Sequence, residues 1–192
     1  MQRGFYFDQS RCIGCYSCVI ACKDWHDIPA GPASWIRVRC IEEGKFPDLH
    51  VAFLSVMCYH CAQPLCVQAC PHVSITKRKE DGIVVVDRGL CLGKKECGFC
   101  KKACPYDAPQ FGDEENAKMQ MCDFCFDRLA ENKNPVCVEA CPMMALKVGP
   151  MDELKTKYGG LKEATGFVFF EEAGPSIIFK PMIQGRGITC GP

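Results

Sequence analysis

Short runs of apolar residues, each separated from the next by polar residues, glycine or proline, follow one another along this chain. Residues 4–8, 35–42 and 51–57 carry the apolar, β-branched and aromatic side chains that favour strands. The segment SITKRKEDGIVVVD predicts two further short strands around a turn at residues 81–82. The longest apolar run, residues 51–59, has about half of the roughly 20 residues that a membrane-spanning helix needs. We therefore expect a fold of short elements that does not enter a membrane by itself.

The last part of the chain shows less periodicity. The segment GPMDELKTKYGG predicts a helix with Pro150 in its first turn, acidic residues early, lysines late and Gly159 at its end. Beyond it, FVFF and SIIFK predict two isolated strands. A segment with so little pattern does not supply a core of its own. We expect residues 151–192 to form a C-terminal extension that wraps a partner protein or the flank of the chain itself.

Composition and charge narrow the class of protein. The chain has 192 residues, 48% of them hydrophobic and 24% charged, which is typical of a soluble globular protein with one domain or two small ones. Lysine and arginine number 23, and so do aspartate and glutamate, so no net charge favours binding to nucleic acid. The stretch MQRGFYFDQSRC contains neither an apolar signal segment nor a twin arginine. We expect a cytoplasmic protein, or one exported folded with a partner that carries the twin-arginine signal.

The cysteine content is the most informative feature of the composition. Eighteen of the 192 residues are cysteine, far above ordinary usage, and sixteen of them fall into four groups of four. Every group ends in C-x3-C and three of the four end in C-P, so the groups are an internal repeat with unequal loops. In chain order the groups are Cys12, Cys15, Cys18, Cys22; Cys58, Cys61, Cys66, Cys70; Cys91, Cys97, Cys100, Cys104; and Cys122, Cys125, Cys137, Cys141.

This spacing is typical of [4Fe-4S] clusters, in which each of four irons takes one thiolate. In two-cluster ferredoxins a tight cysteine loop supplies three ligands, and the cysteine before a proline binds the neighbouring cluster. Pro71, Pro105 and Pro142 occupy that position. Sixteen thiolates therefore predict four [4Fe-4S] clusters.

Two other uses of cysteine are weaker alternatives. Structural zinc sites consist of two C-x2-C pairs with a spacer and give no reason for a regular C-x3-C-P ending. Disulfides at C-x2-C spacing are strained. Of the two cysteines outside the groups, Cys40 is expected to pack as a small apolar residue on a strand, and Cys190 is interpreted as incidental.

The length of the connections predicts how the groups combine. The 21-residue step from Cys70 to Cys91 contains the predicted hairpin, which is what separates the halves of a compact two-cluster ferredoxin. The second and third groups therefore form one pair, and the first and fourth groups form the other. Exchange of the fourth ligand then predicts four ligand sets: Cys12, Cys15, Cys18 and Cys141; Cys22, Cys122, Cys125 and Cys137; Cys58, Cys61, Cys66 and Cys104; and Cys70, Cys91, Cys97 and Cys100.

The predicted fold class is α+β, with two bacterial-ferredoxin-like modules of short strands and helices, one nested in the other. Residues 1–50 and 106–150 form the outer module, residues 51–105 form the inner module, and the C-terminal extension follows. A short helix is expected after the fourth cysteine of each group.

At this point the chain is similar to a known family. It resembles the four-cluster iron–sulfur electron-transfer subunits of the dimethyl sulfoxide reductase family of molybdenum or tungsten enzymes, over about residues 4–160. The resemblance is carried by RCIGCYSCVIACKDW, KRKEDGIVVVD, ACPYDAPQF, MCDFCFDRLAENKNPVCVEACP and GPMDELKTKYG.

The resemblance implies a relay of single electrons. It implies a molybdopterin-binding catalytic subunit as one partner, and a membrane-anchor subunit that handles quinol, or a soluble carrier, as the other. The alternative within the family is the cluster-bearing subunit of a non-respiratory molybdopterin enzyme, of the formate dehydrogenase or aromatic hydroxyl-transfer type. In either case no catalytic residue and no substrate site are expected in this chain, although a cluster-dependent lyase is an alternative from another class.

The third group departs from the usual spacing, because five residues separate Cys91 from Cys97 where two are usual. Lys94 stands where a second cysteine is expected, and a non-cysteine residue there is typical of a three-iron site. If Cys91 is not a ligand, the chain holds three [4Fe-4S] clusters and one [3Fe-4S] cluster. We favour a stretched loop with Cys91 as ligand, since a three-residue insertion costs little in a surface loop. Lys94 and Lys95 would then lie beside the cluster and raise its potential.

A few other residues have modest expectations. His60, in CYHC, is interpreted as a loop residue that makes hydrogen bonds near a cluster, not as an iron ligand, and His72 as a polar group at a cluster edge or a partner surface. Trp25 and Trp35 are expected to pack beside the first module. The basic run at residues 77–79 is expected to be a solvated hairpin end that is able to meet an acidic partner.

Overall fold

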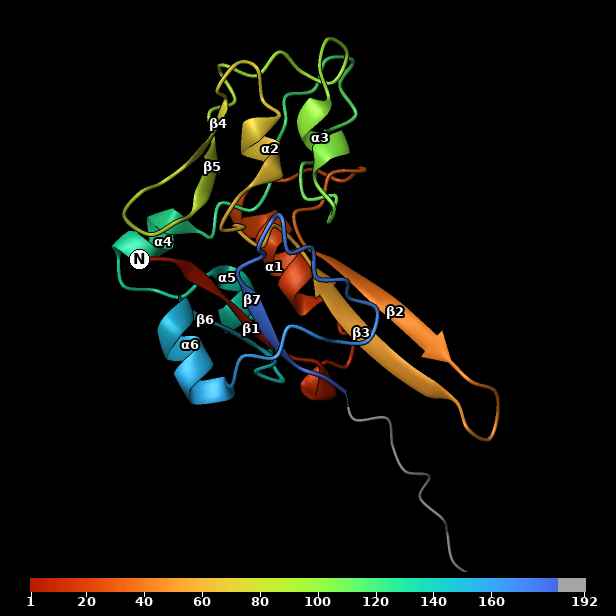
Figure 1. The fold of residues 1–192 in the computed structure, drawn as a ribbon. Helices are drawn as coiled ribbons and strands as arrows, with labels where there is room; N and C mark the ends of the chain where they lie inside the picture. The colour runs from red at the N-terminus through yellow and green to blue at the C-terminus, as the bar shows by residue number, and fades with distance from the viewer. Residues whose placement is uncertain (183–192) are drawn as a thin grey trace, which may run out of the picture.

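A computed structural model describes residues 1–182 of the chain (Figure 1). Its secondary structure is thin, with seven short strands, six α-helices and one 3-10 turn among the described residues. In Figure 1 the yellow and green segments around α2 (Leu65–Gln68), α3 (Phe99–Ala103) and the hairpin of β4 (Ile75–Lys77) and β5 (Val84–Val86) gather at the top. The red and blue segments lie below them. The chain is therefore a mixed helix and strand protein of two layers of short elements.

The lower layer is built on a three-stranded sheet with the order β6-β1-β7. Strand β1 (Arg3–Asp8) pairs antiparallel with β6 (Leu146–Pro150) and parallel with β7 (Ile177–Lys180). The predicted strand at residues 4–8 is confirmed, and so is SIIFK, although SIIFK is not isolated but pairs with the other end of the chain.

The end of β1 is fixed by an acidic side chain. Asp8 lies opposite Lys180, whose Nζ is 3.3 Å from the Asp8 carboxylate, and it also accepts hydrogen bonds from the backbone and hydroxyl of Ser10. Burial alone would raise the pKa of Asp8, but the hydrogen bonds from Ser10 and Lys180 outweigh it, so the pKa is lowered. The charged form of Asp8 therefore stabilises the junction between the two chain ends.

The predicted helix after the last cysteine group is confirmed as α6 (Met151–Tyr158), which ends at Gly159. It packs on the sheet through a stack of Tyr158 on Tyr6, whose ring centroids are 4.0 Å apart. Gly4 on β1 allows this close approach, because a Cβ there would meet the sulfur of Met151 at 2.2 Å.

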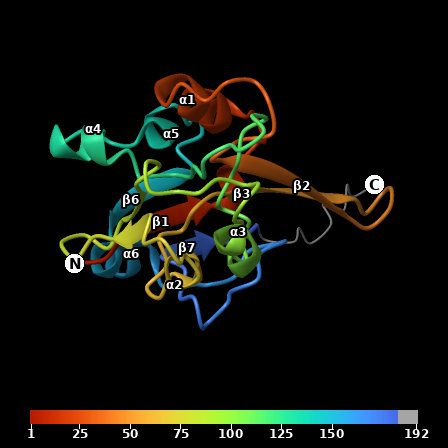
Figure 2. The same cartoon turned by 90° about the horizontal axis from the view of Figure 1, so that it is seen from above.

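Two antiparallel hairpins complete the strands. Strands β2 (Arg37–Glu43) and β3 (His50–Val56) form a long ribbon that extends away from the body in Figure 1, and the short β4–β5 pair lies at the top. Figure 2 shows the same ribbon reaching out from the side opposite α4 (Phe126–Ala130). The predicted strands at residues 35–42, 51–57 and around the turn at 81–82 are confirmed, with bounds shifted by a few residues.

The helices do not follow the fourth cysteine of each group, so that prediction was wrong. Helix α1 (Ser17–Trp25) contains both Cys18 and Cys22, and α2, α3 and α5 (Val136–Glu139) each contain the third cysteine of a group and end at or before the fourth. The reason is geometric, since C-x3-C spans one helical turn and places the two thiols about one turn apart. The helical turn therefore holds the third and fourth thiols of a group apart.

The segment FVFF forms no strand, which corrects the second prediction for the C-terminal part. Phe167 packs inward instead: its ring stacks on Tyr106 with centroids 5.5 Å apart and contacts Tyr59 and Phe179, whereas Phe170 is exposed. The largest buried cluster accordingly combines side chains from the N-terminal strand, the middle of the chain and the C-terminal part. Apolar burial in one shared cluster holds the described chain together as one body.

Candidate metal centres

The structure brings the sixteen grouped cysteines together in four places. We name these places by the cysteines that meet there: site 1 (Cys12, Cys15, Cys18, Cys141), site 2 (Cys22, Cys122, Cys125, Cys137), site 3 (Cys58, Cys61, Cys66, Cys104) and site 4 (Cys70, Cys91, Cys97, Cys100). Sites 1, 3 and 4 surround small cavities of about 20, 10 and 20 Å³. Three small cavities, each lined by four thiols, indicate three copies of one kind of site.

Site 1 is formed by the loop before α1, the first turn of α1 and the loop before β6. Gly14 has a φ of +67°, and a Cβ there would meet the Phe53 ring at 2.4 Å, so the tight loop requires glycine. Cys15 is exposed to solvent. Burial, and to a smaller extent the nearby thiols of Cys12 and Cys141, raise the pKa of Cys18 to about 11.

Site 2 is the most enclosed, since all four of its cysteines are buried. Burial raises the pKa of Cys22, and the thiols of Cys122 and Cys125 raise it further. Burial likewise raises the pKa of Cys137, together with Cys125 and Cys22. These four cysteines come from two segments about 100 residues apart in sequence. Because their thiols raise one another's pKa, the four sulfur atoms lie close together.

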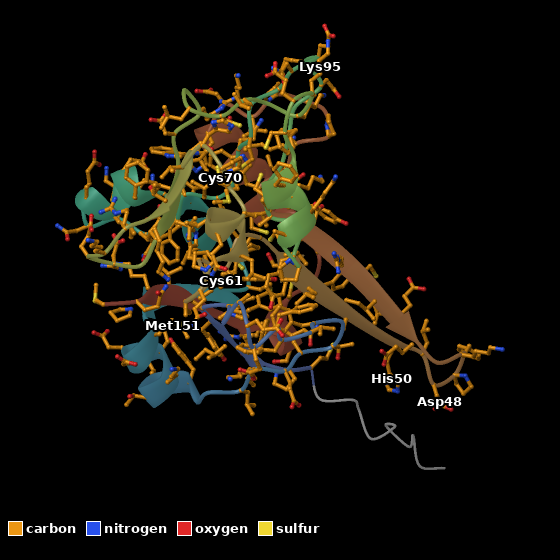
Figure 3. The ribbon with its side chains drawn as sticks, turned by 45° about the horizontal axis from the view of Figure 1, so that its top comes forward. Asp48, His50, Cys61, Cys70, Lys95 and Met151 are labelled. Atoms are coloured by element: carbon orange, nitrogen blue, oxygen red, sulfur yellow. The ribbon has the colours of Figure 1, made fainter. Side chains whose placement is uncertain are left out.

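Site 3 lies under the β4–β5 hairpin. Burial, and to a smaller extent the thiol of Cys104, raise the pKa of both Cys61 and Cys66 to about 12. In Figure 3 Cys61 lies between Cys70 above it and Met151 on α6 below it. Site 3 thus occupies the middle of the body.

Site 4 contains the stretched loop, and the structure places Cys91 on its cavity wall beside Cys70, Cys97 and Cys100. The pKa of Cys100 is raised to about 11. Burial is the main cause and the neighbouring thiols add to it, whereas a hydrogen bond from the Lys101 backbone opposes the rise. The fold therefore brings Cys91 to the same place as the other three cysteines.

Asn116 braces the extra residues of this loop. Its Oδ1 accepts a hydrogen bond from the Lys95 N–H at 3.1 Å, and its Nδ2 donates to the Leu92 carbonyl at 2.8 Å. The Lys94 N–H donates to the Ala117 carbonyl at 3.0 Å. Hydrogen bonds from Asn116 and Ala117 thus hold the extra residues of the loop in place.

Backbone N–H groups point at sulfur in the same way in different sites. His60 N and Phe124 N each lie 3.4 Å from the sulfur two residues earlier, in sites 3 and 2. Ala108 N and Ala145 N lie 3.4 and 3.3 Å from the sulfur four residues earlier, in sites 3 and 1. The sequence repeat is thus also a repeat of local geometry, and donors aimed at sulfur are what a bound iron–sulfur cluster requires.

The four sites lie in one row. The Cys18 thiol of site 1 raises the pKa of Cys22 in site 2, behind burial and nearer thiols. Cys122 of site 2 acts in the same way on Cys58 of site 3, and Cys100 of site 4 on Cys66 of site 3. Neighbouring sites therefore lie close to one another in the order 1, 2, 3, 4. The row runs from a partly exposed end, through an enclosed middle, to a second partly exposed end.

The donor sets fit iron–sulfur clusters. Each site brings four thiols close together, and soft thiolate ligands select iron–sulfur clusters or zinc. When bound, a [4Fe-4S] cluster supplies a one-electron carrier.

His60 is fully buried, and its Nδ1 accepts a hydrogen bond from the Val84 N–H at 2.9 Å. Burial, and to a smaller extent the charge of Lys77, lower the pKa of His60 to about 3, so the ring is neutral. Its ring packs against Phe124 and Phe5. His60 is therefore a core residue, whereas His72 lines the cavity of site 4, at the edge of the cysteine set.

The basic run at residues 77–79 is not a uniformly solvated hairpin end. Lys77 turns inward, and its Nζ donates to the Cys61 carbonyl at 2.6 Å, to the Ala62 carbonyl at 3.1 Å and to Gln2. Burial lowers the pKa of Lys77, against the effect of the Cys61 thiol. Arg78 pairs with Asp81 and lies over the ring of Phe126. Lys77 thus places a cation beside site 3.

The lysines of the stretched loop point away from their cavity. Lys94 Nζ donates to the Gly112 carbonyl at 2.7 Å, and Lys95 pairs with Glu115, while the cavity wall is made by Leu92 and Gly93. In Figure 3 Lys95 lies at the upper extremity of the molecule. The positive charge of Lys94 and Lys95 therefore acts on site 4 less strongly than the sequence predicted, because the carboxylate of Glu115 neutralises the charge of Lys95.

The tryptophans pack beside the first module, as expected. The guanidinium of Arg128 lies over Trp25, and Trp35 packs against His26 and donates its Nε1–H to Gln120. Cys40 is exposed on β2, so the expectation that it packs as a small apolar residue was wrong. Cys190 lies outside the described residues.

Sequence reasoning missed several side chains near sulfur. Ser17 lies 3.4 Å from Cys15 Sγ, Ser74 lies 3.1 Å from Cys70 Sγ, and His26 lies 3.4 Å from Cys125 Sγ. The serines were open to prediction, because each lies two or four residues from its cysteine. His26 was not, because 99 residues separate it from Cys125.

Comparison with known proteins agrees with this geometry. A 4Fe-4S dicluster domain family matches residues 49–151, and a second 4Fe-4S dicluster domain family matches residues 11–74. Within residues 1–182, no helix has the length and apolar character needed to cross a lipid bilayer.

Three curated relatives illustrate the similarity. The B subunit of anaerobic dimethyl sulfoxide reductase from Escherichia coli (strain K12) is 40% identical over 200 residues, covering 99% of this chain and 95% of the relative. The thiosulfate reductase electron transfer subunit PhsB of Salmonella typhi is 38% identical over 81% of this chain and 80% of the relative. Protein NrfC of Escherichia coli (strain K12) is 37% identical over 78% of this chain and 66% of the relative.

The dicluster domains, the sixteen grouped cysteines and the full-length similarity together support four [4Fe-4S] clusters. The chain belongs to the family of four-cluster iron–sulfur electron-transfer subunits that serve reductases of the dimethyl sulfoxide reductase family.

Proposed function

We propose that the chain relays single electrons along the row of sites 1, 2, 3 and 4, with the four cysteines of each site as the ligands of one [4Fe-4S] cluster. The observation that carries this proposal is that sites 1, 3 and 4 are cavities each lined by four cysteines from the predicted sets. The closeness of neighbouring sites supports a continuous path. Burial of the middle of the row supports a path insulated from solvent.

The ends of the row are the natural contact points with partners. Site 1 has an exposed ligand candidate, Cys15, and three of the four cysteines of site 4 are only partly buried. We infer that one end meets a molybdopterin-binding catalytic subunit and that the other meets a quinol-handling membrane subunit or a soluble carrier. Names of the relatives support a multi-subunit reductase as the setting.

We also infer two nested ferredoxin-like modules. Sites 1 and 2 draw on the first and fourth cysteine groups, and sites 3 and 4 draw on the second and third. The outer module would comprise residues 1–50 and 106–150, and the inner module residues 51–105, with residues 151–192 as the extension. Packing of residues 167–179 against Tyr59 and Tyr106 favours an extension that covers the chain's own flank.

Paired ligand substitutions test the assignment. Cys70→Ser and Cys97→Ser should remove or alter the same component of the electron paramagnetic resonance spectrum of the reduced complex, because both belong to site 4. Cys104→Ser should alter the component that Cys58→Ser alters, and Cys40→Ser, outside every site, should alter none. The assignment of exchanged ligands is wrong if Cys70→Ser changes the component that Cys58→Ser changes.

A relay, as opposed to a storage role, is tested in the assembled complex. With an artificial low-potential dye as the donor and the partner's substrate as the acceptor, loss of the site 3 cluster should abolish electron flow from end to end. The relay is contradicted if flow persists at the wild-type rate in a complex that lacks this central cluster.

A further inference from the structure

His26 lies against a ligand of site 2. It is the residue directly after α1, the helix that carries Cys22, and its backbone N–H bonds back to the Cys22 carbonyl at 3.2 Å. One more helical turn beyond Cys22 brings the ring to Cys125, where His26 Nε2 is 3.4 Å from Cys125 Sγ. The imidazole therefore contacts the sulfur of a second site 2 cysteine, which is distant in sequence from Cys22.

The ring is held in place. It packs against the tilted ring of Trp35, with centroids 4.4 Å apart, and Trp35 is itself fixed by the hydrogen bond from its Nε1 to Gln120 Oε1 at 3.1 Å. The side chain of His26 is only 10% exposed. Nε2 also lies 3.6 Å from the Asp123 carboxylate, which in turn accepts a hydrogen bond from the Cys125 N–H. Histidine, carboxylate and cysteine thus form one compact group.

The direction of the hydrogen bond follows from chemistry. A cysteine that binds iron is a thiolate, which only accepts hydrogen bonds, and the Asp123 carboxylate is also an acceptor. Nε2 must therefore carry the hydrogen, and Cys125 Sγ, at 3.4 Å, lies nearer to Nε2 than the Asp123 carboxylate at 3.6 Å does. Within residues 1–182 this is the one imidazole nitrogen at hydrogen-bond distance from a grouped cysteine sulfur.

We propose that His26 is a positioning residue that sets the reduction potential of the site 2 cluster by donating a hydrogen bond from Nε2 to the Cys125 thiolate. A donor to sulfur stabilises the reduced cluster, which carries one more negative charge, relative to the oxidised one, and so raises the potential. Asp123 opposes this effect with its negative charge. The inference rests on the proposed assignment of Cys22, Cys122, Cys125 and Cys137 to one cluster.

His26→Phe provides the test, because phenylalanine keeps a ring to stack on Trp35 but has no donor. In a redox titration of the intact complex followed by electron paramagnetic resonance, one of the four clusters should shift to a lower midpoint potential while the other three keep theirs. His26→Gln, whose amide also donates, should restore part of the shift. His50→Phe, on the exposed start of β3, is the matched control and should leave all four potentials unchanged.

The outcomes separate this inference from the ligand assignment. Four intact clusters in His26→Phe with four wild-type potentials would overturn the role of His26. Cys125→Ser tests the assignment independently: if it perturbs a component other than the one that Cys22→Ser perturbs, site 2 itself is wrong. A shift in His26→Phe that falls on the component altered by the site 3 variants would likewise reject the inference. If His26→Phe loses iron, His26→Leu, which also lacks a donor, is titrated in its place, and four wild-type potentials in that variant would reject the donor role.

Discussion

Replacement of Asn116 by alanine tests the interpretation of the stretched loop at site 4. The change removes both hydrogen bonds through which this side chain holds residues 92–95, one to the Lys95 N–H and one to the Leu92 carbonyl. Cys91 lies one residue before that braced segment. We expect the Asn116→Ala protein to assemble four clusters but to lose the iron held by Cys91 more readily.

The structure limits the size of the effect. A typical intramolecular hydrogen bond contributes about 1 kcal/mol, so two contribute about 2 kcal/mol. Lys118 Nζ also lies 3.2 Å from the Leu92 carbonyl, and the exposed Lys95 N–H is able to bond water, so part of the loss is compensated. A net cost of about 1–2 kcal/mol corresponds to about a 5- to 30-fold larger population of the open loop.

The assay follows the product of iron loss. When the complex is oxidised with ferricyanide, a [4Fe-4S] cluster that loses one iron becomes a [3Fe-4S] cluster with its own paramagnetic signal. The rate at which this signal appears should rise about 5- to 30-fold in Asn116→Ala if opening limits the reaction. Asn134→Ala, at an exposed asparagine elsewhere on the chain, is the control.

The reasoning is refuted if Asn116→Ala and Asn134→Ala both produce the three-iron signal at the wild-type rate. It is also refuted if wild-type protein already contains a three-iron cluster as isolated under anaerobic conditions, since Cys91 would then not be a ligand.

Three further predictions follow from single contacts. Cys91→Ser should convert one cubane to a three-iron cluster or destroy it, and a spectrum that still shows four unaltered cubanes would reject Cys91 as a ligand. Lys77→Met should lower the potential of the site 3 cluster and leave the other three unchanged in the same redox titration, because it removes a half-buried cation beside Cys61; an unchanged site 3 potential would contradict this. Asp8 has a lowered pKa, so its stabilisation is complete above the unfolded pKa of about 3.9 and is lost as the pH falls through the lower folded value. Below about pH 4, iron release should therefore accelerate less steeply in Asp8→Asn than in wild type, and parallel pH profiles would disprove the role.

The cysteine spacing, the lengths of the connections and the ferredoxin rule of exchanged fourth ligands together predicted which thiols lie together. C-x3-C puts Cys18 and Cys22 one helical turn apart, so one short helix has to deliver its thiols to two different sites. The same rule applies at Cys66 and Cys70. Strands β1 and β3 were also predictable, because their aromatic and branched residues form continuous runs.

Contacts between distant segments were out of reach of sequence reasoning. Nothing in SIIFK indicates that β7 pairs with β1 at the other end of the chain, since its apolar run would suit any sheet edge. Lys77 looked like a surface residue, because a basic run is usually solvated, yet three acceptors from elsewhere in the chain draw it inward. His26 likewise has a role only because α1 and the Cys122–Cys125 loop meet at site 2.

The helix positions show where a local rule was misapplied. The sequence interpretation began a helix after the fourth cysteine, where proline at 71, 105 and 142 suits a first turn. The structure instead uses the turn between the third and fourth cysteines, as in α3 and α5. Proline ends these helices, because it cannot continue the hydrogen-bond ladder.

The most direct test of four clusters in this protein is the iron and acid-labile sulfide content of the complex isolated without oxygen. Metal analysis is combined with electron paramagnetic resonance before and after reduction, and iron of the catalytic partner is subtracted. Four clusters predict about sixteen iron and sixteen sulfide per copy of the protein, all in [4Fe-4S] form. About eight of each, or zinc in place of iron at any of the four sites, would contradict the presence of four clusters.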